Sequence, residues 1–152
     1  MKIETLRDVL HWARAYHQQL QQCLEHCVDK AESERARMLL DYLSDHEKKL
    51  ARALEAFEEQ ADSRALHTFC NEYMDKQPIL QHESCTASLA DMETGEIIVD
   101  ILHRHDQIMA LYQHLRLRLP KGHAEVFLQE LEDLEEHESM QMVKHYQQLE
   151  DL

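Results

Sequence analysis

The chain of 152 residues contains only two glycines and two prolines, a composition typical of a single, almost wholly helical domain. So few glycines exclude a Gly-rich phosphate loop or a dinucleotide-binding motif. The formal net charge of −14 argues against nucleic acid and anionic membranes as partners and favours cations. No apolar run approaches the ~20 residues that span a bilayer, and from the amphipathic pattern that follows Met1 we expect no signal peptide. We therefore expect a cytoplasmic protein whose four cysteines are thiols.

Apolar residues at helical spacing predict four long helices in chain order. The first helix spans about residues 5–28, and the second follows a short turn and ends near residue 60. Residues 61–94 contain a short helical stretch and then a polar segment, which is longer than the ~2–8 residues that join neighbouring helices in a bundle. The third helix spans about residues 95–119, and the fourth spans about residues 123–149.

The length of residues 61–94 determines the predicted topology. Two helical hairpins, at about 5–60 and 95–150, are joined by this segment as a long crossover between the second and third helices. Such a connection predicts an all-α, up-down-down-up four-helix bundle that forms one domain over residues 1–152.

Two internal echoes indicate that one hairpin is a duplicate of the other. Residues 40–47 (LDYLSDHE) recur as residues 131–138 (LEDLEEHE), 91 positions later (131 − 40). On the first and third helices, His17 and His105 stand 88 positions apart (105 − 17), and each interrupts a seam of apolar residues. A duplicated hairpin predicts an internal pseudo-twofold repeat.

The polar residues of these echoes point to a metal site. An unpaired carboxylate in a helical core costs several kcal/mol, so it must be protonated, paired or coordinated. No lysine or arginine lies on the seams near these levels. Imidazole and carboxylate that face one another inside a bundle are usual ligands of iron, manganese or zinc. The predicted ligands come from all four helices and are His17, His46, Glu47, His105, His137 and Glu138. Of these, His46 and His137 could complete the ligand set or only support it.

With this architecture, repeat and set of inward ligands, nearly the whole chain resembles the ferritin-like superfamily, the bundles that include rubrerythrins and other di-iron carboxylate proteins. The usual Glu-x-x-His motifs of that family are absent, because Leu43 and Leu134 stand three residues before the histidines of the two echoes. The resemblance implies a centre of two iron ions that reacts with oxygen or peroxide, with manganese or zinc as other metals. Glu47 and Glu138 would resemble the bridging carboxylates of the family.

Two alternative functions stay open at this stage. His17 and His105 could serve as the axial ligands of a haem across the bundle. The chain could also be a metal-free interaction or scaffold protein whose acidic surface binds a partner. The sequence leaves open whether the protein is an enzyme, whether it forms a homodimer, and which redox partner it would use.

Overall fold

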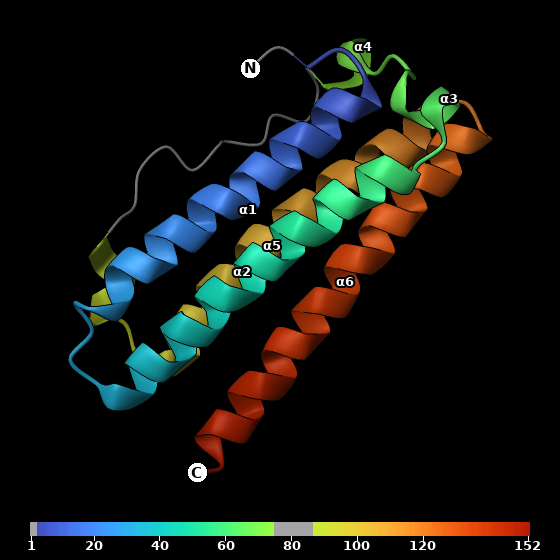
Figure 1. The fold of residues 1–152 in the computed structure, drawn as a ribbon. Coiled ribbons are helices and arrows are strands. Elements are labelled where there is room, and N and C mark those ends of the chain that lie inside the picture. Colours follow the sequence, from blue (N-terminus) through green and yellow to red (C-terminus); the bar gives the residue numbers. More distant parts are fainter. Residues whose placement is uncertain (1–2, 75–86) are drawn as a thin grey trace.

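The computed structural model describes residues 3–74 and 87–152, and Figure 1 shows their arrangement. Four long helices dominate: α1 (Leu6–Val28), α2 (Glu34–Gln60), α5 (Thr94–Arg118) and α6 (His123–Glu150). Between the two hairpins, the described residues form three short elements, namely α3 (Ser63–Leu66), α4 (Asn71–Met74) and the 3-10 helix η1 (Ala87–Asp91). The described residues contain no strand beyond one isolated bridge between Thr5 and Phe69. The prediction of an all-α fold is therefore confirmed.

Local sequence signals explain where the long helices begin. At the start of α1, the Thr5 backbone N–H donates to Asp8 Oδ2 at 3.1 Å, which is half of a capping box. The Ser33 hydroxyl caps α2 by accepting from the Ala36 backbone N–H at 3.3 Å. Gly122 precedes α6 with φ = 133°, a conformation that side chains rarely tolerate. The predicted ends of the four helices agree with the structure to within a few residues.

The four long helices form two antiparallel hairpins, α1 with α2 and α5 with α6, and α2 also packs against α6. In Figure 1, α1 and α6 run in one direction, and α2 and α5 run in the other. At the end of the bundle where α1 begins, the Leu6 backbone N–H donates to the Thr68 carbonyl at 3.0 Å. η1 lies at the opposite end, beside the last turns of α1. The predicted crossover therefore begins and ends at opposite ends of the bundle, although its residues 75–86 lie outside the described residues.

Burial along the helices follows a single internal spacing. Core residues of the first hairpin recur 88 positions later in the second, and both members of each pair are buried. Examples are Leu10 and Ile98, Ala13 and Ile101, Leu20 and Ile108, Leu40 and Leu128, Leu43 and Leu131, and Leu54 and Met142. The spacing of 91 does not describe burial on α2 and α6, because His46 is buried whereas His137 is exposed. The spacing of 88 therefore relates these core positions on all four long helices.

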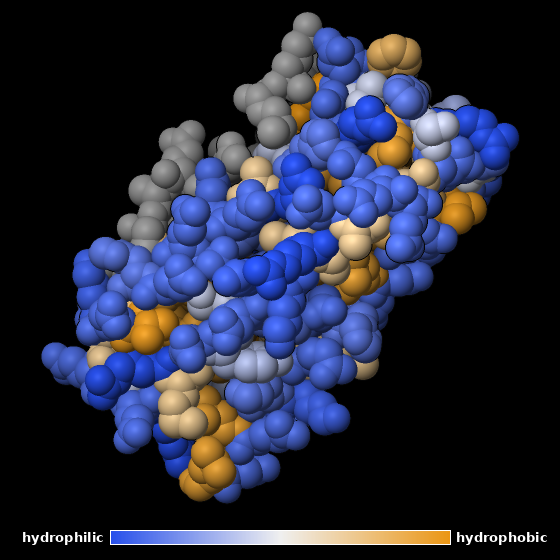
Figure 2. All heavy atoms as spheres, viewed as in Figure 1, coloured by the Kyte–Doolittle hydropathy of each residue, from blue (hydrophilic) through white to orange (hydrophobic). Residues whose placement is uncertain are grey.

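The face of the molecule seen in Figure 2 is mainly polar. Figure 2 shows that hydrophilic residues cover most of one face of the molecule, with hydrophobic side chains in separate patches. Among the described residues, no helix combines the length and the apolar character needed to cross a membrane.

The cysteines differ in part from the expectation. Cys27 and Cys70 are buried thiols, as predicted. Cys23, by contrast, is disulfide-bonded, which corrects the prediction of four thiols. Cys85 lies outside the described residues. Because disulfides persist mainly in oxidising compartments, the cysteines do not support the expectation of a cytoplasmic protein.

Candidate metal centre

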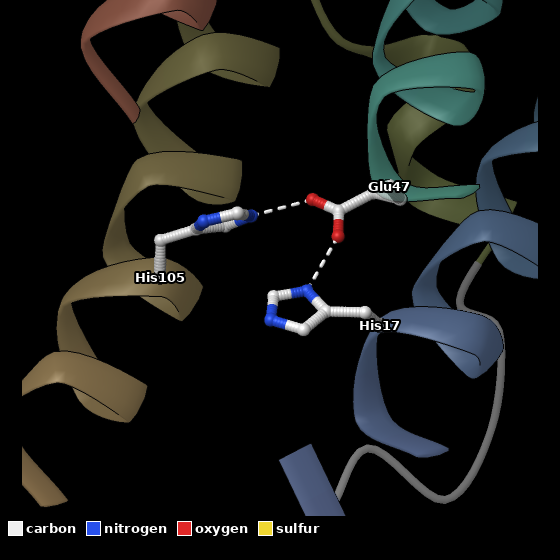
Figure 3. Close-up of side chains that lie close together, drawn as sticks. All are labelled: His17, Glu47 and His105. Atoms are coloured by element: carbon white, nitrogen blue, oxygen red, sulfur yellow. Dashed lines mark hydrogen bonds and ion pairs between the residues drawn. The ribbon is translucent and has the colours of Figure 1, made fainter. Parts of the chain in front are cut away.

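Four ionisable side chains meet in the core, one from each long helix. They are His17 from α1, Glu47 from α2, His105 from α5 and Glu135 from α6, and each is 0% exposed. We call these four residues the quartet. Figure 3 shows how His17, Glu47 and His105 point toward one another from three helices.

Helix periodicity explains why these polar groups lie inside. Each quartet residue stands four positions, or about one turn, after a buried apolar residue of the same helix and so shares its inward face. These preceding residues are Ala13, Leu43, Ile101 and Leu131. The apolar contacts of the four seams therefore hold both imidazoles and both carboxylates at one place in the core.

The quartet forms a ring in which each imidazole lies between both carboxylates. His17 Nδ1 is 2.6 Å from Glu47 Oε2, and His17 Nε2 is 2.8 Å from Glu135 Oε1. His105 Nε2 is 2.5 Å from Glu47 Oε1. The fourth edge is longer, since His105 Nδ1 is 3.5 Å from Glu135 Oε2. Both His105 Nδ1 and Glu135 Oε2 are buried, and neither has a hydrogen-bond partner among the described residues.

The mutual contacts determine the charges of the quartet. Burial acts to lower the pKa of both imidazoles, but the two carboxylates outweigh it and raise the pKa of His17 to about 9 and that of His105 to about 10. Burial acts to raise the pKa of the carboxyl groups, yet the two imidazoles hold the pKa of Glu47 well below its usual value and that of Glu135 at about 2. Without a metal, the quartet at pH 7 therefore contains two imidazoliums and two carboxylates and is neutral overall.

A buried tyrosine contacts the quartet from the side. The Tyr112 hydroxyl donates to Glu135 Oε1 at 3.4 Å, and burial together with this carboxylate raises the pKa of Tyr112 well above its ordinary value. The residue 88 positions earlier is Leu24, which is also buried. The tyrosine therefore distinguishes one half of the repeat from the other and orients only one of the two carboxylates.

The structure brings together three of the six predicted ligands. His17, Glu47 and His105 can each offer a ligand atom to one ion, because these atoms lie within 4.8 Å of one another. The other three predicted ligands, His46, His137 and Glu138, lie outside the quartet.

Two of those three residues contact each other. His46 is buried, and its Nε2 lies 2.7 Å from Glu138 Oε2, whose side chain is partly exposed. Burial lowers the pKa of His46, although the carboxylates of Glu138 and Glu47 oppose this shift. His137 is exposed. We call His46 and Glu138 the outer pair.

Glu135 is the quartet residue that the sequence analysis did not identify. The signal was present, because the spacing of 88 between His17 and His105 also relates Glu47 to Glu135 (135 − 47). The match of letters between residues 40–47 and 131–138 gives a spacing of 91 instead. That match selects Glu138, which lies one helical turn further along α6.

Comparisons with protein-family models, with curated proteins and with solved structures give no match. Only the chemistry of the quartet and its surroundings therefore bears on function.

Proposed function

We propose that this protein binds a divalent metal ion at the quartet, inside an up-down-down-up bundle of the ferritin-like kind. One observation carries the proposal: two imidazoles and two carboxylates from four different helices meet in a fully buried ring. The opposite directions of the helices within each hairpin, and the position of the crossover between the hairpins, support the topology.

The donor set favours particular metals. Two imidazole nitrogens with two carboxylate oxygens suit iron, manganese or zinc, whereas magnesium and calcium prefer oxygen alone and copper(I) prefers sulfur. Iron is the metal that the resemblance implies. Iron held by these four side chains would keep coordination positions open, and its reaction with oxygen or peroxide is the chemistry it would supply.

Charge balance favours one ion in the quartet. A divalent cation with two carboxylates and two neutral imidazoles gives a neutral interior, which a buried site requires. Two divalent ions would bring four positive charges against the same two carboxylates. A second ion would then need further anionic ligands, so we propose a single ion at the quartet rather than the two ions that the resemblance implies.

A metal-free function is the second candidate. Three of the four edges of the ring are already at hydrogen-bond distance, so the protonated quartet is largely satisfied without an ion. In that case the acidic surface would bind a partner, and the quartet would be only a buried ion-pair network. Haem is less well supported, because both carboxylates contact both imidazoles and a haem between His17 and His105 would have to displace them.

Metal content separates these functions. Protein purified without chelator and then reconstituted anaerobically with Fe²⁺ should contain about one ion per chain by plasma mass spectrometry. The Glu135→Gln variant should lose this ion. Glu136→Gln is the matched control, because Glu136 is the next residue of α6 and is exposed. Wild-type protein without metal after reconstitution would contradict the proposal and leave the metal-free function, and a Soret band would support haem.

A further inference from the structure

The buried position of the quartet raises the question of how an ion reaches it. All four side chains are shielded from solvent by the surrounding helices. An ion that moved between these helices would lose its water before it gained protein ligands, unless donor atoms lay along its path. Polar residues that flank the quartet are the groups that can supply such donor atoms.

The outer pair flanks the quartet between α2 and α6. His46 immediately precedes Glu47 on α2, and Glu138 lies one turn after Glu135 on α6. The side chains of His46 and Glu138 are 8% and 21% exposed, respectively, so the pair lies between solvent and the closed ring. His46 Nε2, the nitrogen that contacts Glu138, is itself buried. One imidazole and one carboxylate thus converge beside the quartet.

The internal repeat provides a control for the outer pair within the same molecule. The residues related by 88 positions are Leu134 for His46 (134 − 46) and Leu50 for Glu138 (138 − 50). Leu50 is fully buried and Leu134 is partly buried against the core. The bundle therefore accepts an apolar residue at each equivalent position. Because a polar pair at such a position costs desolvation that leucine does not, the fold alone does not explain His46 and Glu138.

The opposite flank of the quartet has different chemistry. Tyr16 and Arg104 immediately precede His17 and His105, and their side chains hydrogen-bond to each other between α1 and α5. Arg104 Nε also donates to Asp100 Oδ2 at 2.8 Å. A guanidinium carries a positive charge and has no lone pair for a metal ion. This side of the quartet therefore does not favour the passage of a cation.

A row of stacked rings leads from the outer pair toward the surface. The Tyr42 ring stacks on the His46 ring, with centroids 5.7 Å apart, and on the partly exposed His145 ring, with centroids 3.5 Å apart. Tyr42 thereby holds the His46 imidazole from one side. His145 places a further imidazole nearer to solvent on the same flank of the bundle.

We infer that the outer pair is a loading site, at which a divalent metal ion binds transiently between α2 and α6 before it passes to the quartet. This role depends on the proposed function of the quartet. Two protein donors with water suit a weak, rapidly exchanging position, whereas the four donors of the quartet suit a tight one. Glu47 follows His46 directly and is the quartet carboxylate nearest in sequence to the outer pair, so it would receive the ion.

The loading role predicts a kinetic effect without an equilibrium effect. The test uses anaerobic stopped-flow absorbance of Co²⁺ binding to the wild-type protein and to the double variant His46→Leu/Glu138→Leu, whose leucines reproduce the residues at the equivalent positions. Loading should slow at least about tenfold, the size by which local charge commonly changes association rates. Removal of Co²⁺ by a chelator should slow by the same factor, because the ion leaves by the same path. The dissociation constant and the number of ions bound should stay within about twofold.

Two further variants make the result specific. Glu136→Leu also exchanges one α6 carboxylate for leucine, but at an exposed position outside the pair, and it should load at the wild-type rate. Glu138→Gln keeps the shape of the side chain and should still slow loading, so the outcome does not depend on the folding of the double variant.

Unchanged rates in the outer-pair variants would overturn the loading role. A reduced number of ions would also overturn it, because the outer pair would then hold an ion permanently. Wild-type protein that takes up no Co²⁺ would overturn the proposed function itself, and this failure is visible without any variant.

Discussion

Binding of a divalent ion to the quartet should release about two protons, and this is the most direct consequence of the structure. In the metal-free protein, each imidazole is protonated because it lies between two carboxylates. An imidazole must lose a proton before it can ligate a metal. The ion therefore replaces two protons, and the interior remains neutral in both states.

The size of the effect follows from the pKa values of the two histidines. With a pKa of about 9 for His17 and about 10 for His105, both imidazoles are about 99% protonated or more at pH 7. The association constant should then rise by about 100-fold per pH unit up to about pH 9. Between about pH 9 and 10 the rise should approach tenfold per unit, and above pH 10 the constant should level off.

The assay is a Zn²⁺ titration of chelator-treated protein in weak buffer at pH 7, followed with a pH indicator. Zinc avoids the protons that accompany iron oxidation. Calorimetry in two buffers of different ionisation enthalpy gives the same proton count independently. A release near zero would refute the reasoning, because it would mean that zinc binds exposed carboxylates, which are already ionised. The Glu135→Gln variant measures this background directly.

Four further outcomes are expected. Glu135→Gln should weaken metal binding by more than about 100-fold, since changes outside the ligand shell alone cost about 10–100-fold. Glu138→Gln should leave the dissociation constant nearly unchanged. If calorimetry shows equal losses of affinity for the two variants, Glu138 is also a ligand, as the spacing of 91 predicts. In the metal-free protein, the protonated His17 and His105 stabilise the fold. This stabilisation is fully present below their unfolded pKa of about 6.5 and is lost as the pH rises through their folded pKa values of about 9 and about 10. Urea unfolding should therefore occur at lower urea at pH 9.5 than at pH 6, and a flat profile would contradict the charge assignment. Tyr112→Phe removes one hydrogen bond to Glu135 and should destabilise the protein by about 0.5–1.5 kcal/mol in urea unfolding; no change would mean that this long contact contributes nothing. Replacing the whole quartet by leucine and methionine should abolish metal binding yet stabilise the metal-free bundle by about 1–4 kcal/mol, and unfolding of that variant would show that the charges specify the fold.

The fold was predictable from the sequence because its helices are strongly periodic and its loops are polar. Seam residues such as Leu10, Leu43 and Ile101 determine which face of each helix is inward, and the scarcity of glycine and proline leaves few other structures. The short elements were harder, since four-residue helices such as α3 have too few residues for a period to be visible.

The site was predictable where seam position, rather than a match of letters, selected the residue. His17, Glu47 and His105 each continue an apolar seam, and all three belong to the quartet. Alignment of the identical residues in 40–47 and 131–138 pairs Glu47 with Glu138 instead of Glu135. Burial shows instead that Leu131, and not Leu134, is the fully buried leucine of the α6 phrase. A shift of three residues turns a side chain by about 60° around the helix, which is enough to exchange the inward Glu135 for the partly exposed Glu138.

The repeat also explains why the quartet closes on itself. Each hairpin contributes one histidine and one glutamate, related by the same 88 residues, so the two halves bring equal numbers of donors and acceptors to one place. The arrangement is neutral with two bound protons and would be neutral with one divalent ion, so neither state leaves a net charge in the core. A simple ion-pair network would need only the neutral state with two bound protons.

The outer pair differs from the quartet, because leucines stand at the equivalent positions in the other half of the repeat. The packing of the bundle therefore does not require His46 and Glu138. Under the proposed loading role, the rate of metal loading is the property that they change.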